Sequence, residues 1–176
     1  MAVLDIIKLG NPVLRQGSVT VDPKEIKTKA FQQLIDDMFE TMVQAEGIGL
    51  AAPQVARSIQ LVVMECQGEQ GFPATVLINP KILFYGPTQV ENWEGCLSVD
   101  NLRGKVTRPS MVRVQYLDRT AAKVETDATG LFAVCIQHEM DHLLGKVFLD
   151  RMTDMSTLTQ LHEFEKYWLK EPAAVI

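Results

Sequence analysis

The sequence predicts an α+β fold, in which a central buried helix packs against antiparallel or mixed β-sheets and further helices lie near the N- and C-terminal ends. Two observations favour this class. Segments with the apolar pattern of strands cluster in the middle of the 176 residues, and segments with helical periodicity flank them. The length suits one domain and no linker or internal repeat divides the chain, so we expect a single domain over residues 1–176.

The first long helix is predicted over about residues 24–46. Asp22-Pro23 supplies an N-terminal signal and Gly47 a C-terminal stop. The apolar residues between them follow the i, i+3, i+4, i+7, i+11 spacing of one helix face: Phe31, Leu34, Ile35, Met38 and Met42.

The middle of the chain contains the predicted strands. Residues 59–66 form a mainly apolar run that predicts a buried strand, and residues 68–73 form a turn region. Pro80 separates two further short strands, and an alternating pattern predicts a strand with a hairpin partner after it. These strands cover residues 75–79, 82–85, 111–117 and 123–126.

Two helices follow the strands. Residues 129–144 are apolar nearly all round in the first half of the segment, which predicts a helix buried at the centre of the fold. Residues 156–170 place Leu161, Phe164 and Trp168 on one face, which predicts a C-terminal helix.

Charge and composition exclude several kinds of protein. The chain has 17 Lys and Arg against 22 Asp and Glu, a net charge of −5, which disfavours binding to nucleic acid through phosphate contacts. The longest apolar run, residues 131–136, is far shorter than the roughly 20 residues of a membrane span. No signal peptide is recognisable, and three cysteines do not make a disulfide framework, so we expect a cytoplasmic protein with reduced thiols.

The strongest chemical signal is His138-Glu139-Met140-Asp141-His142 within the predicted buried helix. Residues i and i+4 lie about 40° apart around a helix, so both imidazoles can reach one metal ion. Glu139 is offset by about 100°, which places its carboxylate beside such an ion, where a base for an attacking water is needed. Two structural histidines are the alternative, but polar groups in an apolar helix need partners. We therefore predict a metal-binding helix.

A catalytic site needs a third protein ligand. The extended metzincin motif would place a histidine where this chain has Phe148, so that class is excluded. Glu163 or Glu165, beside His162, would match zinc peptidases with a downstream acid, although the charged surroundings of these residues favour a solvated helix face.

The cysteines are the remaining candidates. Cys135 lies about 10.5 Å along the helix from His142, too far for ligand bonds of about 2.0–2.3 Å to a shared ion, so we expect it in the core or a pocket wall. Cys66 falls in a predicted buried strand. Cys96 follows a glycine in a polar segment where the backbone can approach a metal closely, and an ordinary free thiol is the equal alternative there.

Residues 47–54 form a glycine-rich segment. Residues 47–52 match the G-x-G-x-x-A pattern of dinucleotide-binding loops, but that motif follows a strand and opens a helix. Here it follows a predicted helix and precedes Pro53 and a strand. We expect instead a loop that brings backbone and Gln54 close to an extended ligand.

Taken together, three segments resemble the peptide deformylase family, which carries G-x-G-L-A-A-x-Q, E-G-C-L-S and H-E-x-D-H in this order. The matching segments are residues 47–54, 94–98 and 138–142, and the resemblance extends over residues 7–150. The family removes the formyl group from the N-terminal formyl-methionine of newly made bacterial or organellar polypeptides and releases formate. The resemblance therefore implies a metal-dependent hydrolase acting on N-formyl-methionyl peptides.

The resemblance also implies roles for the matching residues. Glu139 would be the general acid and base, and Gln54 and the backbone N–H of Leu97 would stabilise the oxyanion. One divalent metal ion, commonly ferrous iron in the family with zinc as the alternative, would be held by Cys96, His138 and His142. The implied substrate-binding residues are Ile48, Gly49, Glu94, Arg103, Leu131, Val134 and Cys135, with His138 also lining the methionine pocket. Arg108 and Asp141 would support the site.

Two features depart from the family pattern. The family usually continues E-G-C-L-S-x-P, and here Asp100 replaces the proline, which relaxes the backbone and adds negative charge near the entrance of the site. Relatives often carry a basic C-terminal extension that docks on the ribosome. Residues 169–176 and those before them carry mixed charge, so we do not expect ribosome docking by that route.

Two other functions compete with a deformylase. The first is an H-E-x-x-H endopeptidase that cuts internal bonds, and Cys96 in place of a downstream ligand counts against it. The second is a homologue that keeps the metal but only binds peptides, and the intact Glu139 and Gln54 count against it.

Overall fold

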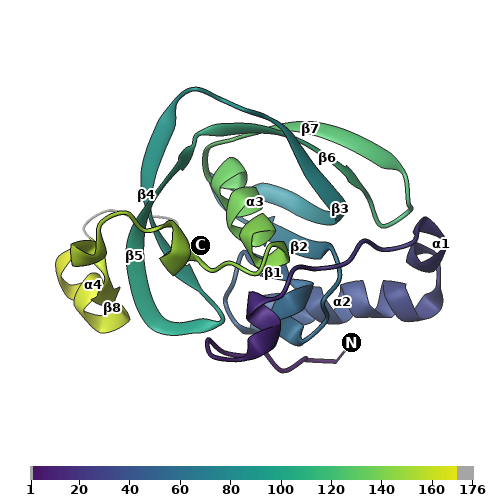
Figure 1. The fold of residues 1–176 in the computed structure, drawn as a ribbon, viewed down its shortest axis with the longest axis horizontal. Helices are drawn as coiled ribbons and strands as arrows, with labels where there is room; N and C mark the ends of the chain where they lie inside the picture. The colour runs from purple at the N-terminus through teal and green to yellow at the C-terminus, as the bar shows by residue number, and fades with distance from the viewer. Residues whose placement is uncertain (1, 170–176) are drawn as a thin grey trace.

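The computed structural model describes residues 2–169, and in them two antiparallel sheets and a central helix, α3 (Gly130–Leu143), form the framework (Figure 1). One sheet has the strand order β1-β2-β3-β6-β7 and the other β4-β5-β8. The strands of the first are β1 (Gly49–Ala51), β2 (Leu61–Cys66), β3 (Phe72–Tyr85), β6 (Met111–Leu117) and β7 (Lys123–Thr129). Those of the second are β4 (Gln89–Cys96), β5 (Val99–Pro109) and β8 (Thr159–Gln160). The predicted α+β class is confirmed.

The helix α3 is enclosed as the sequence predicts. It contacts β1, β2 and β6 of the first sheet and β5 of the second, and Figure 1 shows it between them. From Ala133 to Leu143 every residue except Met140 is buried. Burial on nearly all sides suits the apolar first half of α3. The polar side chains of its second half need hydrogen-bond or charge partners inside the protein.

The predicted helix over residues 24–46 is divided in two. α1 (Pro23–Ile26) ends before Thr28, whose hydroxyl accepts a hydrogen bond from the N–H of Phe31 and caps α2 (Lys29–Gln44). A threonine at the N-cap is favoured because it satisfies a free backbone donor, and this local signal divides the apolar pattern. The predicted apolar face is nevertheless present, because its residues in α2 pack against β1 and β2.

The two strands predicted over residues 75–79 and 82–85 are one strand, β3, which already begins within the predicted turn. Pro80 lies where the pairing of β3 with β6 shifts register, so its missing N–H is accommodated at an irregularity of the ladder. Asn79 adopts a positive φ of 51° there, and its side chain bonds the backbone N–H and C=O of Val21.

No pattern in the sequence predicted β4, β5, β1 or β8 as strands. β4 and β5 are a hairpin in which Cys96 pairs with Val99, leaving a turn at Leu97 and Ser98. Much of this hairpin is polar and half exposed, which hides the alternation of a buried strand. The segment over residues 47–54 contains β1 and a short 3-10 helix, η2 (Ala52–Val55), rather than a plain loop.

The predicted C-terminal helix over residues 156–170 is shorter in the structure. Its first residues form a 3-10 turn, η4 (Met155–Thr157), and the strand β8, and α4 covers Leu161–Tyr167. The end of the prediction, residue 170, lies outside the described residues. Phe164 packs edge-on against Trp93 of β4, with ring centroids 5.0 Å apart, so the predicted apolar face does contact the hairpin. Within residues 2–169, no helix is long and apolar enough to cross a membrane.

Candidate metal centre

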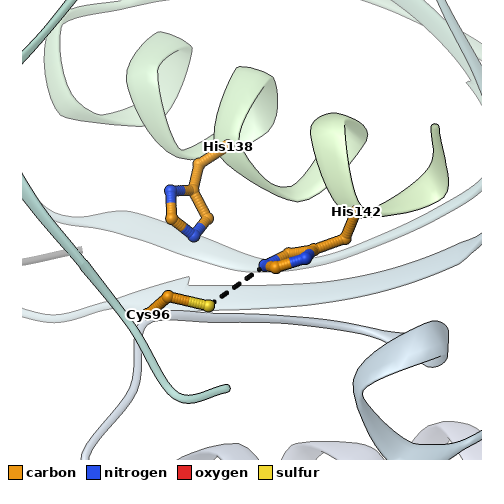
Figure 2. Close-up of side chains that lie close together, drawn as sticks. All are labelled: Cys96, His138 and His142. Carbon is orange, nitrogen blue, oxygen red and sulfur yellow. Dashed lines mark hydrogen bonds between the residues drawn. The ribbon is translucent and has the colours of Figure 1, made fainter. Parts of the chain in front are cut away.

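Three side chains from two distant segments meet beside α3. His138 and His142 point from the helix toward Cys96 at the end of β4, as Figure 2 shows. One ligand atom from each of the three lies within 4.8 Å of the others, and the distance from Cys96 Sγ to His142 Nε2 is 3.3 Å. All three residues are buried. This is the grouping that the sequence resemblance implied for a metal ion.

The hairpin and a second turn orient the Cys96 sulfur. The pairing of β4 with β5 shifts register between Glu94 and Cys96, and the tight turn brings the N–H of Ser98 within 3.4 Å of the sulfur. Gln54 in η2 donates from Nε2 to Cys96 Sγ at 3.6 Å and to the Ser98 hydroxyl at 3.3 Å, while its Oε1 accepts from the N–H of Ala51. Sequence reasoning gave Ser98 no role, although it is part of the matched E-G-C-L-S motif.

The donor set fits a divalent cation. One thiolate and two imidazoles suit zinc or ferrous iron. Burial alone lowers the pKa of His138, but hydrogen bonds with Cys96 and Glu94 outweigh burial and raise that pKa to about 10. The negatively charged surroundings that raise this pKa also favour a metal cation at this position. Burial lowers the pKa of His142 well below its ordinary value, which keeps its ring in the neutral, metal-binding form.

A buried charge network fixes His138 from the side away from the ligand cluster. Its Nδ1 lies 2.9 Å from Glu94 Oε2, which leaves Nε2 for the ligand cluster. Arg108 binds Glu94 through Nε and Nη2 and reaches Asp141 Oδ2 through Nη1 at 2.9 Å, and Arg151 also binds Asp141. Burial alone raises the pKa of Glu94, but the bonds from Arg108 and His138 prevail and lower it to about 2. Glu94 is thus a charged support for His138.

We expect Arg108→Lys to lower the free energy of unfolding by about 2 kcal/mol, because a buried carboxylate then loses a charged hydrogen bond. A lysine ammonium cannot reproduce the planar fork that serves Glu94 and Asp141 together. Urea denaturation at equal metal loading measures the change. Arg113→Lys is the matched control: Arg113 makes the same two-point contact with Asp127, but on the surface, so we expect less than about 0.5 kcal/mol. Equal losses in both variants would contradict this account.

A cavity of about 370 Å³ opens onto the ligand cluster. Of the residues predicted for the site, the cavity is lined by Ile48, Gly49, Gln54, Cys96, Leu97, Arg103, His138 and Glu139. Glu94, Leu131, Val134 and Cys135 do not line it. Leu131 and Cys135 pack with Ile48 in one apolar cluster, and Cys135 Sγ lies 3.8 Å from the Ile48 carbonyl. Glu94 is buried in the charge network instead.

Glu139 lies at the wall of this cavity without being part of the ligand cluster. Burial raises its pKa to about 7, so near neutral pH it can both accept and release a proton. Its Oε2 has no hydrogen-bond partner among the described residues. A Cβ on Gly49 would come within 2.5 Å of Glu139 Oε1, so only glycine leaves room for this carboxylate.

The other candidate ligands lie elsewhere. His162 and Glu163 pair with each other at 3.0 Å on the exposed side of α4, as expected for a solvated face. Burial raises the pKa of the Cys135 thiol well above its ordinary value, so it stays protonated, unlike a ligand. Cys66 lies in β2, and residues 47–52 open no long helix of the dinucleotide-binding kind.

Comparison with known proteins gives one consistent result. The profile of the family described as polypeptide deformylase matches residues 3–157. A peptide deformylase from Leptospira biflexa is 43% identical over 159 residues, which cover 86% of this chain and 89% of the relative. A Met-Ala-Ser-bound class I type b peptide deformylase from Acinetobacter baumannii superposes with a TM-score of 0.82 at 36% identity, covering 86% of this chain and 99% of that one. An actinonin complex of a peptide deformylase from Synechococcus elongatus gives 0.81 at 41% identity, covering 93% and 85%.

Proposed function

Because this chain belongs to the polypeptide deformylase family, we propose that it hydrolyses the N-formyl group of the N-terminal formyl-methionine of newly made polypeptides and releases formate. The observation that carries the proposal is a single cavity that joins Cys96 and His138 to Glu139 and Gln54. This combination provides a metal site, a proton acceptor and a side-chain amide donor within one water-accessible space.

In this proposal Cys96, His138 and His142 hold one divalent metal ion. When bound, the ion lowers the pKa of a water molecule from about 15.7 to about 7 and polarises the formyl carbonyl. Glu139 would accept a proton from the attacking water and later deliver it to the leaving amine, for which a pKa of about 7 is well matched. Gln54 Nε2 and the backbone N–H of Leu97 donate to the oxygen that gains negative charge.

The peptide lies along the cavity wall formed by Ile48, Gly49 and Arg103. The Acinetobacter relative has Met-Ala-Ser bound, which supports a peptide substrate here. For the methionine side chain we propose the side of the cavity at Ile48, against which Leu131 and Cys135 of α3 pack. Val134 on the same helix and Glu94 beside His138 complete the proposed set. An unbranched thioether adapts well to such a space.

The decisive experiment compares formyl-Met-Ala, acetyl-Met-Ala and a peptide with an internal scissile bond. We expect strong preference for the formyl substrate, because its carbon carries only hydrogen and the crowded glycine-lined wall clashes with an added methyl group. Competition assays give the ratio of kcat/KM values. Comparable rates on acetyl and formyl substrates would refute the selectivity, cleavage of the internal bond would favour an endopeptidase, and binding without turnover would favour a peptide-binding homologue.

For the metal we propose ferrous iron, with zinc as the alternative. Affinity favours zinc over ferrous iron, so tightness of binding does not identify the working metal. Iron differs in having redox chemistry, and a ligating thiolate is the oxidisable form of cysteine. We expect the ferrous form to be markedly more active than the zinc form and to lose activity in peroxide, with Cys96 as the oxidised residue. Anaerobic reloading with each metal, followed by assay before and after peroxide, checks this. Equal activity in both forms would overturn the iron assignment.

We place this activity in the cytoplasm, where new polypeptides are made. The substrate is the N-formyl-methionyl peptide, and the proposal includes neither a membrane nor a direct nucleic-acid contact. Ribosome docking through a basic C-terminus is not part of it, because the charges before residue 170 are mixed and residues 170–176 lie outside the described part of the chain.

A further inference from the structure

Three successive residues near the N-terminus bond the two turns that carry the proposed oxyanion donors. The N–H of Ile7 donates to the Gln54 carbonyl at 2.9 Å, and the N–H of Leu9 donates to the Ser98 carbonyl at 2.7 Å. Between them, Lys8 Nζ donates to the Leu97 carbonyl at 2.8 Å. The segment thus connects the η2 turn to the β4–β5 turn.

The peptide group between Leu97 and Ser98 is held at both ends. Its carbonyl oxygen accepts from the Lys8 ammonium, and its N–H donates to Cys96 Sγ at 3.4 Å. A cation on the carbonyl oxygen polarises the whole amide and makes its N–H a stronger donor. Lys8 therefore acts on the Cys96 sulfur through one peptide group, and it fixes the neighbouring Leu97 N–H through the same turn.

Asp100 gives Lys8 its second acceptor. Lys8 Nζ lies 2.7 Å from Asp100 Oδ1, and both side chains are more than half exposed and line the mouth of the cavity. An exposed ion pair of this kind adds little to stability, so its consequence is the direction in which the ammonium points. The carboxylate stands where the family pattern has a proline, which has no charge to hold a lysine.

We propose that Lys8 is a positioning residue for the metal centre, held in place by Asp100, which strengthens the Ser98 N–H bond to Cys96 and sets the position of the Leu97 N–H. The effect on the sulfur is independent of the reaction catalysed. The effect on the Leu97 N–H rests on the proposed function.

Cobalt-substituted protein tests the effect on the sulfur. Hydrogen bonds to a ligand tune the metal that it binds, and a thiolate that loses hydrogen bonding donates charge more readily, so its sulfur-to-cobalt absorption moves to longer wavelength. We expect this shift in Lys8→Met and the original spectrum in Lys8→Arg, which keeps the charge and a donor. Lys105→Met is the matched control, because Lys105 makes an equally close pair with Glu91 on the same hairpin at 2.8 Å. An unchanged spectrum in Lys8→Met would overturn the proposal.

Steady-state kinetics test the effect on the Leu97 N–H. Removing an oxyanion donor costs about 10²–10³-fold in kcat, and a misplaced donor keeps part of its effect, so we expect Lys8→Met to lower kcat about 10-fold with KM within about twofold. Asp100→Asn should lower kcat less than Lys8→Met does, and combining the two substitutions should lower kcat no further than Lys8→Met alone. If Lys8→Met does not fold, Asp100→Asn serves as the test. A raised KM with unchanged kcat would show instead that Lys8 binds the peptide, and would contradict the positioning role.

The two readouts separate this inference from the proposed function. If the unsubstituted protein lacks deformylase activity but Lys8→Met shifts the cobalt spectrum, the proposed function is wrong and the role of Lys8 at the sulfur stands. If the protein is an active deformylase and neither the spectrum nor kcat responds to Lys8→Met or Asp100→Asn, the inference about Lys8 is wrong and the proposed function stands.

Discussion

Cys96→Ala is expected to remove most of the metal from the purified protein and with it the activity. The substitution deletes one of the three protein ligands. Two imidazoles alone are too few, because a catalytic metal site needs three protein ligands. No neighbouring thiol replaces it: Cys135 is seven residues from His142 along α3, and burial keeps its thiol protonated. Elemental analysis of the dialysed protein measures the stoichiometry.

Cys66→Ala is the control for this prediction. Cys66 lies in β2, outside the ligand cluster, and is only partly buried, so its variant should keep a metal content near that of the unsubstituted chain. Full metal occupancy in Cys96→Ala would show that another residue is the third ligand.

Glu139→Gln should keep the metal and lose activity by about 10²–10⁴-fold, the usual contribution of a general acid or base. The amide has the size of the carboxylate, so it fits the space beside Gly49, but it cannot accept and return a proton. Since Glu139 lies outside the ligand cluster, metal content should stay at its original level. Parallel measurement of kcat/KM and metal content separates the two roles.

A surface glutamate provides the control. Glu163 carries the same charge on the exposed side of α4 and contacts only His162 in the described ion pairs, so Glu163→Gln should change kcat/KM by less than a factor of about two. If Glu139→Gln kept nearly full activity, a different group would have to be the base. If it lost its metal, Glu139 would have to be counted among the ligands.

The parts of the site that follow from local spacing were predictable from the sequence. His138 and His142 share a helix face whatever the rest of the fold does, and the offset of Glu139 follows from the same geometry. Cys96 is different, because its approach to His142 depends on a turn between two strands that showed no strand pattern. Only the resemblance to a family connected these segments, since spacing alone left a metal ligand and an ordinary free thiol as equal alternatives for Cys96.

The errors in the fold have physical causes of the same kind. The Thr28 hydroxyl donates to the Glu25 carbonyl in α1 and accepts from the Phe31 N–H at the start of α2, and an apolar stripe cannot reveal such local bonds. β3 continues through Pro80 because Asn79 absorbs the irregularity with a positive φ and two side-chain bonds to Val21, a segment far away in sequence. Such tertiary compensation is invisible to periodicity and propensity.

The wall of the cavity at Gly49 has a consequence for inhibitors. Any side chain added there would collide with the Glu139 carboxylate, and at Gly95, on the opposite hairpin, it would collide with the Arg103 guanidinium. A substitution at either glycine would therefore have to displace Glu139 or Arg103. A compound that binds the backbone groups of these two glycines contacts a surface that point mutations cannot change without such a displacement. At Gly49, where the displaced group is the proposed proton acceptor, resistance by substitution would be linked to loss of the proposed activity.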